Sequence, residues 1–136
     1  MASETILAVD DDVMALDLCC SVLTHAGYRV LRAASGAEAL ELYRRSAQRI
    51  DMALVDVVMP GMNGIELVKR LQTLKRSPKV ALISGYSPDE VDRLVGKDGV
   101  GYRIFWKPYE IPVFLQMIRN VLDSPLRANA AGVSRP

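Results

Sequence analysis

The sequence predicts an α/β fold in which a doubly wound, five-stranded parallel sheet has helices on both faces. Five short apolar runs alternate with longer segments of helical period, which is the pattern of repeated βα units. Most runs are apolar at successive positions, as in strands that are covered on both faces. The 136 residues suffice for one such domain but not for two ordinary cores. A small sheet with right-handed crossovers is typical of the flavodoxin-like strand order 2-1-3-4-5.

The first strand is predicted at residues 6–9, and the helix after it has one apolar stripe made of Leu16, Cys19, Cys20 and Leu23. Gly27 stands where that helix should stop, since a left-handed residue commonly ends a helix. The second strand is predicted at residues 28–31. The second helix should begin near residue 36, because Ser35 and Glu38 have the spacing of a capping box.

The third strand is predicted at residues 52–55, and its helix has a stripe made of Leu67, Val68, Leu71 and Leu74. After the fourth strand, at 80–83, Ser87 and Glu90 form a second capping box with Pro88 at the first helical position. That helix should begin near residue 88 and stop at Gly96 or Gly99. The fifth strand is predicted at 102–106, and the last helix has a stripe made of Phe114, Met117, Ile118 and Val121.

The apolar period ends after residue 122, where small and polar residues take over. We therefore predict one domain over residues 4–123 and a flexible C-terminal tail over residues 124–136. A tail of this length leaves no room for a DNA-binding or catalytic domain after residue 123, so the expectation is that any output lies in another polypeptide.

Charge and composition narrow the function classes. The formal net charge is +1, which provides no strong field to attract nucleic acid or anionic lipid. The longest stretch without Asp, Glu, Lys or Arg, residues 18–28, is about half of the ~20 residues that a membrane span needs. The N-terminus has no basic region before an apolar one, so the expected location is cytoplasmic. Cys19 and Cys20 are adjacent and are interpreted as reduced core thiols rather than a disulfide.

Polar residues follow four of the predicted strands. Asp10, Asp11 and Asp12 end the first strand, Asp56 the third, Ser84 the fourth and Lys107 the fifth. The carboxyl ends of parallel strands face one crevice, so these groups should meet there. Carboxylates gathered at neighbouring strand ends repel one another, and a hard divalent cation such as Mg²⁺ or Mn²⁺ would offset that repulsion. Asp12 is interpreted as the cap of the first helix.

Asp56 closes an apolar strand ahead of a Pro/Gly turn, which alone is ordinary. Beside Lys107 and Ser84 it becomes a candidate nucleophile towards phosphorus, because a transferring phosphoryl group spreads negative charge over three oxygens. Each oxygen could then find a positive or hydrogen-bond-donating partner. Pro108 follows Lys107, and a cis bond there is a way to aim the lysine inward.

The order of these motifs resembles that of a response-regulator receiver domain, the phospho-acceptor module of bacterial two-component signalling. The resemblance covers about residues 4–123 and rests on the segments 6–12, 56–64, 84–85 and 107–109. It implies that Asp56 accepts a phosphoryl group from a phosphohistidine of a sensor histidine kinase or a histidine phosphotransfer protein. It also implies a downstream protein target that binds the fourth helix, fifth strand and fifth helix.

The same resemblance assigns roles around Asp56. Asp11 and Asp56 would bind Mg²⁺ directly, Asp10 mainly through water, and the backbone carbonyl of Val58 would complete the protein ligands. The phosphoryl oxygens would be bound by Ser84, Gly85 and Lys107. The protein would then be a signalling acceptor, with self-catalysed phosphotransfer and autodephosphorylation only, and no enzyme.

The sequence departs from the family pattern at two positions. Ser84 stands where many members have Thr, and Ser keeps the hydroxyl. Ile104 stands three residues before the lysine, where members usually have the Tyr or Phe that rotates inward after phosphorylation. Phe105 should point to the other face of the sheet, so it cannot replace that aromatic residue.

Three other functions stay open. A phosphatase of the haloacid-dehalogenase type uses similar residues but has its nucleophilic aspartate after the first strand and its acidic pair last. A nucleotide- or flavin-binding module would need a Gly-rich first turn where this chain has three aspartates. A receiver-like interaction module that is not phosphorylated is kept open by Ile104.

The sequence also predicts the places of two further residues. His25, the only histidine, should be a surface residue at the end of the first helix. Tyr86, two residues after Ser84, either overhangs the site and governs access to it or is an ordinary turn aromatic.

Overall fold

The computed structural model describes residues 4–46, 49–74, 76–96, 102–107 and 109–125. Within these ranges five strands alternate with five helices, as the sequence predicts. The elements are β1 (Thr5–Val9), α1 (Val13–His25), β2 (Arg29–Ala33), α2 (Gly36–Arg45), β3 (Met52–Asp56), α3 (Gly64–Gln72), β4 (Lys79–Ser84), α4 (Pro88–Val95), β5 (Ile104–Trp106) and α5 (Ile111–Asp123).

The strands form one parallel sheet in the order β2-β1-β3-β4-β5, which confirms the predicted topology. Two strands begin later than predicted. Tyr28 precedes β2 because its amide donates to the carbonyl of Leu23 at 3.1 Å and closes the end of α1. Tyr102 precedes β5, and its hydroxyl donates to Oε1 of Gln72 at 3.3 Å.

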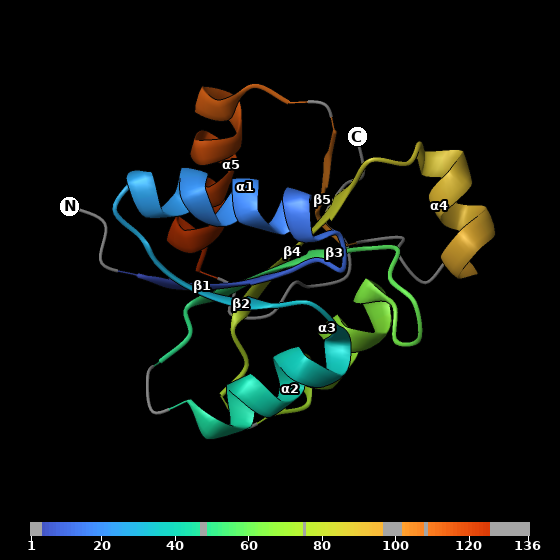
Figure 1. The fold of residues 1–136 in the computed structure, drawn as a ribbon, viewed down its shortest axis with the longest axis horizontal. Helices are drawn as coiled ribbons and strands as arrows, with labels where there is room; N and C mark the ends of the chain where they lie inside the picture. The colour runs from blue at the N-terminus through green and yellow to red at the C-terminus, as the bar shows by residue number, and fades with distance from the viewer. Residues whose placement is uncertain (1–3, 47–48, 75, 97–101, 108, 126–136) are drawn as a thin grey trace.

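Helices cover both faces of the sheet, and each face has its own apolar core. α1 and α5 lie on one side and α2 and α3 on the other (Figure 1), where α4 also packs through Val91. Successive strand residues contribute to opposite cores: Leu82 packs with α2, α3 and α4, and Ile83 packs with α1 and α5. The edge strand β2 is the exception, since Arg29 and Arg32 are exposed. The other edge strand, β5, has only three residues.

The helix starts follow the predicted caps in part. At α4, Ser87 and Glu90 make the full capping box. At α2, Ser35 accepts from the amide of Glu38, but the Glu38 carboxylate accepts from Ala34 instead of from Ser35. A third box, between Asn63 and Glu66 at α3, was not predicted.

Two of the predicted helix stops have the expected backbone. Gly27 has φ 101° and Gly96 has φ 74°, conformations that favour glycine. Gly99 and most of the predicted tail, residues 126–136, lie outside the described residues, so the flexible tail stays a prediction. No described helix is both long and apolar enough for a bilayer crossing.

Candidate functional site

Three aspartates meet at the carboxyl edge of the sheet. One carboxylate oxygen from each of Asp10, Asp11 and Asp56 lies within 4.8 Å of the others. The cause is the strand order: β1 and β3 are neighbours with Val9 opposite Val55, so the residues that follow reach the same rim. Asp10 is buried, Asp56 is half-buried and Asp11 is exposed. The structure thus brings together the three carboxylates that the sequence singled out.

The cluster is short of positive charge. Burial, followed by the charge of Asp10, raises the pKa of Asp56 to about 7, although Lys107 opposes the shift. Burial also raises the pKa of Asp10, against the amide of Asp12, which donates to Asp10 Oδ1 at 2.9 Å, and against Lys107. Three gathered carboxylates, two of them partly desolvated, offer only oxygen ligands and fit a hard divalent cation such as Mg²⁺.

A tight loop holds Asp56 in place. Gly64 at the start of α3 packs so closely on it that a Cβ there would lie 2.1 Å from the Asp56 carbonyl oxygen. The amide of Gly64 donates to the carbonyl of Val57 at 2.8 Å, and the amide of Val57 donates to Ile83 at 3.0 Å. Val58 lies half-buried in the same loop. Gly64 belongs to the segment 56–64 that carries the family resemblance, but the sequence predicts no role for it. A close approach of two backbone segments leaves no signal in one sequence.

Ser84 and Lys107 occupy neighbouring positions at the same rim. Ser84 is fully buried, and its carbonyl accepts from the amide of Lys107 at 2.8 Å. Its hydroxyl accepts from the amide of Tyr86 at 3.0 Å and donates to the carbonyl of Tyr86 at 3.4 Å. A Cβ on Gly85 would lie 3.7 Å from Cδ of Lys107, so the lysine side chain passes close to Gly85.

Lys107 and Asp10 line one small pocket, and the charge of Lys107 opposes the rise in the pKa of both Asp10 and Asp56. The rim therefore combines three carboxylates, one ammonium and one hydroxyl. Pro108 lies outside the described residues, so the expectation about the bond before it stays untested.

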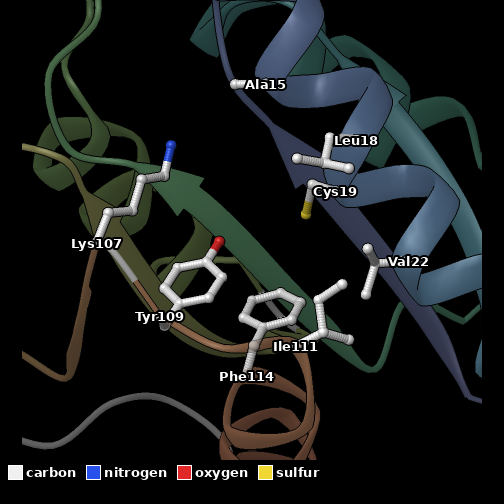
Figure 2. Close-up of a pocket in the computed structure, with 8 residues that line it drawn as sticks. All are labelled: Ala15, Leu18, Cys19, Val22, Lys107, Tyr109, Ile111 and Phe114. Atoms are coloured by element: carbon white, nitrogen blue, oxygen red, sulfur yellow. The ribbon is translucent and has the colours of Figure 1, made fainter.

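An apolar pocket of about 300 Å³ opens beside Lys107, between α1 and α5 (Figure 2). Tyr109 forms one wall and stacks on Phe114 with ring centroids 4.8 Å apart. Figure 2 shows the sulfur of Cys19 pointing into the pocket. Burial raises the pKa of Cys19 to about 12, so this thiol is protonated at neutral pH. Cys19 and Cys20 are both free, as predicted, although only Cys20 is fully in the core.

Ile104 and Phe105 lie on opposite faces of the sheet, as strand alternation predicts. Ile104 is buried in the core under α2, α3 and α4, whereas Phe105 packs edge-to-face on Phe114 with centroids 6.2 Å apart. The position three before the lysine is therefore a packed aliphatic residue, and no neighbouring aromatic ring replaces it from the next position.

Three other residues that the sequence analysis named, Asp12, His25 and Tyr86, lie at a helix cap, a helix end and a loop. Asp12 caps α1 by accepting from the amides of Met14 at 3.0 Å and Ala15 at 3.2 Å, as predicted. His25 is exposed in the last turn of α1, also as predicted. Tyr86 is 44% exposed, and it is its backbone that contacts the Ser84 hydroxyl.

Comparison with known proteins agrees with this geometry. A family model described as the response regulator receiver domain matches residues 6–119. The chain belongs to the receiver-domain family. It is 32% identical over 130 residues to sporulation initiation phosphotransferase F of Bacillus subtilis (strain 168), a match that covers 95% of this chain and 100% of the relative.

Solved receiver-domain structures have the same fold. A CheY-like receiver domain protein from Methanospirillum hungatei JF-1 is 30% identical, with a TM-score of 0.74, over 88% of this chain and 94% of that one. The chemotaxis protein CheY4 of Vibrio cholerae is also 30% identical, with a TM-score of 0.71, over 88% and 98% of the two chains.

Other relatives are much longer than this receiver domain. It matches 50% of the transcriptional regulatory protein AfsQ1 of Streptomyces coelicolor at 35% identity. It matches only 13% of the sensor kinase CckA of Brucella abortus at 31% identity. The family is that of the receiver domains of two-component response regulators. Receiver domains interact with histidine kinases and phosphotransfer proteins and bind Mg²⁺ at an acidic pocket.

Proposed function

We propose that this receiver domain accepts a phosphoryl group on Asp56 from a phosphohistidine of a sensor histidine kinase or a histidine phosphotransfer protein. The observation that carries the proposal is the carboxylate cluster of Asp10, Asp11 and Asp56 within 4.8 Å, at the rim where Lys107 and Ser84 also lie. The receiver domain would comprise residues 4–123, and its proposed location is the cytoplasm.

The transfer is a displacement at phosphorus. A carboxylate oxygen of Asp56 attacks the phosphorus, and the new P–O bond forms as the P–N bond to the donor imidazole breaks. The electron pair of that bond stays on the ring nitrogen, which takes up a proton, and the product is an acyl phosphate on Asp56. Later attack by water on phosphorus returns the carboxylate and releases inorganic phosphate.

The chain's own residues stabilise the charge of the transferring group. The Lys107 ammonium would pair with one phosphoryl oxygen, the Ser84 hydroxyl would donate to another, and the amide of Gly85 would be a further donor. Asp56 must be ionised to attack. Because burial and Asp10 raise its pKa to about 7, neighbouring positive charge is needed to keep the carboxylate in its reactive form.

The donor atoms of this rim fit Mg²⁺ or Mn²⁺. Asp11 and Asp56 would hold the ion directly, Asp10 through water, and the carbonyl of Val58 would complete the protein ligands. When bound, the ion would neutralise the carboxylates and the charge on the phosphoryl oxygens.

The phosphodonor is proposed to dock on α1 and the start of α5. It must bring its imidazole to Asp56, and the apolar pocket of Figure 2 borders that rim through Lys107. Large apolar side chains on these two helices are exposed: Met14 is 82% and Leu18 64% exposed on α1, and Ile111 is 51% exposed on α5. An exposed apolar patch of this kind favours a protein partner.

The downstream target is proposed to bind a different surface, which is formed by α4, β5 and α5.

A small phosphodonor tests the acceptor directly. The 136-residue chain is incubated with acetyl phosphate and Mg²⁺, and its intact mass is measured. One added phosphoryl group is expected in the wild type and in the matched surface variant Asp17→Asn, and none in Asp56→Ala. A gain that persists in Asp56→Ala would refute the assignment of the acceptor.

The same experiment separates the alternatives. A receiver-like module that is not phosphorylated would show no mass gain at all. A haloacid-dehalogenase-type phosphatase would release phosphate from a phosphate monoester with sustained turnover. The order of the acidic groups favours the acceptor, since the pair Asp10 and Asp11 follows the first strand and Asp56 the third.

A further inference from the structure

Trp106 and Ser84 are opposite each other in the β4–β5 ladder. Partners in a parallel pair project their side chains from the same face, so the indole ring lies on the side of the sheet where Ser84 projects. This is also the face on which Ile104 packs, two residues before Trp106. Trp106 itself is half-buried and packs against the core under α2, α3 and α4.

The indole N–H of Trp106 is buried and has no hydrogen-bond partner within the part of the chain that the structure describes. Buried donors are almost always paired in folded proteins, and each exception calls for an explanation. An unpaired donor destabilises the arrangement in which it is found, and it favours any second arrangement that supplies an acceptor.

The Tyr86 carbonyl becomes such an acceptor when the bonding of the Ser84 hydroxyl changes. A hydroxyl has one proton to donate, and the Ser84 hydroxyl now donates to the carbonyl of Tyr86 at 3.4 Å. In the proposed function the same proton must go to a phosphoryl oxygen on Asp56. Ser84 cannot make both bonds, so phosphorylation leaves the Tyr86 carbonyl without its present donor.

We propose that phosphorylation exchanges the donor to the Tyr86 carbonyl, from the Ser84 hydroxyl to the indole N–H of Trp106. The inference rests on the proposed function of Asp56 and Ser84. It pairs the buried side-chain donor that has no partner among the described residues with the acceptor that the Ser84 hydroxyl leaves, and it assigns to Trp106 the aromatic response that Ile104 cannot give.

The exchange would carry the phosphorylation signal to the surface. Tyr86 is 44% exposed in the β4–α4 loop, and Trp106 ends β5. Movement of the two towards each other changes the shape of the molecule between β5 and α4, which is part of the face proposed for the downstream target.

The test uses the single tryptophan of the chain. The ¹⁵N-labelled 136-residue chain gives one indole N–H resonance. This resonance is followed with Mg²⁺ alone and with Mg²⁺ plus beryllium fluoride, a phosphoryl mimic. We expect the resonance to move downfield with beryllium fluoride and the indole hydrogen to exchange with solvent about two- to tenfold more slowly, the effect of one net hydrogen bond. Asp56→Asn should show neither change.

Two substitutions at Ser84 test the exchange without any phosphoryl group. Ser84→Ala removes the hydroxyl donor from the Tyr86 carbonyl, so the indole resonance should be shifted already with Mg²⁺ alone. Ser84→Thr keeps the hydroxyl, and its resonance should stay at the wild-type position until beryllium fluoride is added. Dispersed amide spectra of both variants establish that they are folded.

The outcomes separate this inference from the proposed function. A mass gain on Asp56 with an unmoved indole resonance overturns the donor exchange and leaves the acceptor role intact. No mass gain overturns the acceptor role. In that case phosphorylation cannot drive the exchange, and the inference falls with the acceptor role. Independently of that role, a Ser84→Ala indole resonance at the wild-type position overturns the exchange.

Discussion

The Cα of Gly64 faces the carbonyl oxygen of Asp56 so closely that an added Cβ would lie 2.1 Å from that oxygen. The obstacle is backbone, since the added Cβ would also lie 2.9 Å from the Asp56 carbonyl carbon and 3.0 Å from the Val57 Cα. Neither group can turn aside as a flexible side chain can. The loop that positions the acceptor therefore depends on glycine at residue 64.

Gly64→Ala should destabilise the protein by about 1–3 kcal/mol, because overpacking against fixed backbone forces the loop to shift. Urea denaturation measures the change. Gly85→Ala is the matched control: its nearest contact would be an ordinary 3.7 Å to Lys107 Cδ, so its cost should be below about 1 kcal/mol. Equal costs for the two variants would contradict this account of the loop.

The stability of the metal-free protein should fall as pH rises from about 4 to 7. The pKa of Asp56 is raised from 3.8 to about 7 in the folded state, so between these values the folded chain keeps a proton that the unfolded chain has lost. The stabilisation is fully present below pH 4 and is lost by about pH 7, with an upper limit of about 4 kcal/mol.

Asp56→Asn should remove this part of the pH dependence. Melting temperatures measured in a chelator at pH 5 and pH 8 should then differ less for the variant than for the wild type, with the variant the more stable of the two at pH 8. Parallel pH profiles for the two proteins would show that Asp56 titrates normally.

Mg²⁺ should raise the melting temperature by several degrees, since it binds the gathered carboxylates of the folded state. At 100 times its dissociation constant the stabilisation is about 2.7 kcal/mol. Asp11→Asn should abolish the effect. Asp12→Asn is the control, because Asp12 caps α1 outside the cluster and its variant should keep the full Mg²⁺ response. A melting curve unchanged by saturating Mg²⁺ would argue against the metal site.

Leu18→Arg should slow phosphotransfer from a phosphorylated histidine phosphotransfer protein by about tenfold or more, since it places a charge at the centre of the proposed donor surface. Leu18 is 64% exposed, so the fold and the phosphorylation by acetyl phosphate should be unaffected. Leu94→Arg on α4, where the side chain is 54% exposed, is the matched control. A donor that docks on α4 would give the opposite result.

Most of this fold could be predicted from the sequence, because the helix and strand signals are local and the strand order follows from general rules of topology. The βα alternation and the capping boxes at Ser35 and Ser87 located the elements, and the strand order then brought Asp10, Asp56 and Lys107 to one rim. The clearance around Gly64 and the pocket between α1 and α5 were not predictable in this way. They depend on distances between segments far apart in the chain, which a periodic pattern does not encode.

The buried indole N–H of Trp106, which has no partner among the described residues, is another feature that the sequence could not predict. Its place on the strand and its face could be predicted from alternation alone. Whether its N–H finds an acceptor depends on how segments far apart in the chain pack around the ring. Hydrogen-bond satisfaction is a property of the packed molecule.

The two borders of the sheet limit how this protein can associate. One is formed by β2, whose outward Arg29 and Arg32 are charged and exposed, and the other by β5, which is only three residues long. A foreign strand would find charge at the first border and few free backbone groups at the second. Recognition by strand addition is thereby disfavoured, and binding is left to side chains of helices and loops, where contacts form and dissolve without rearranging the ladder.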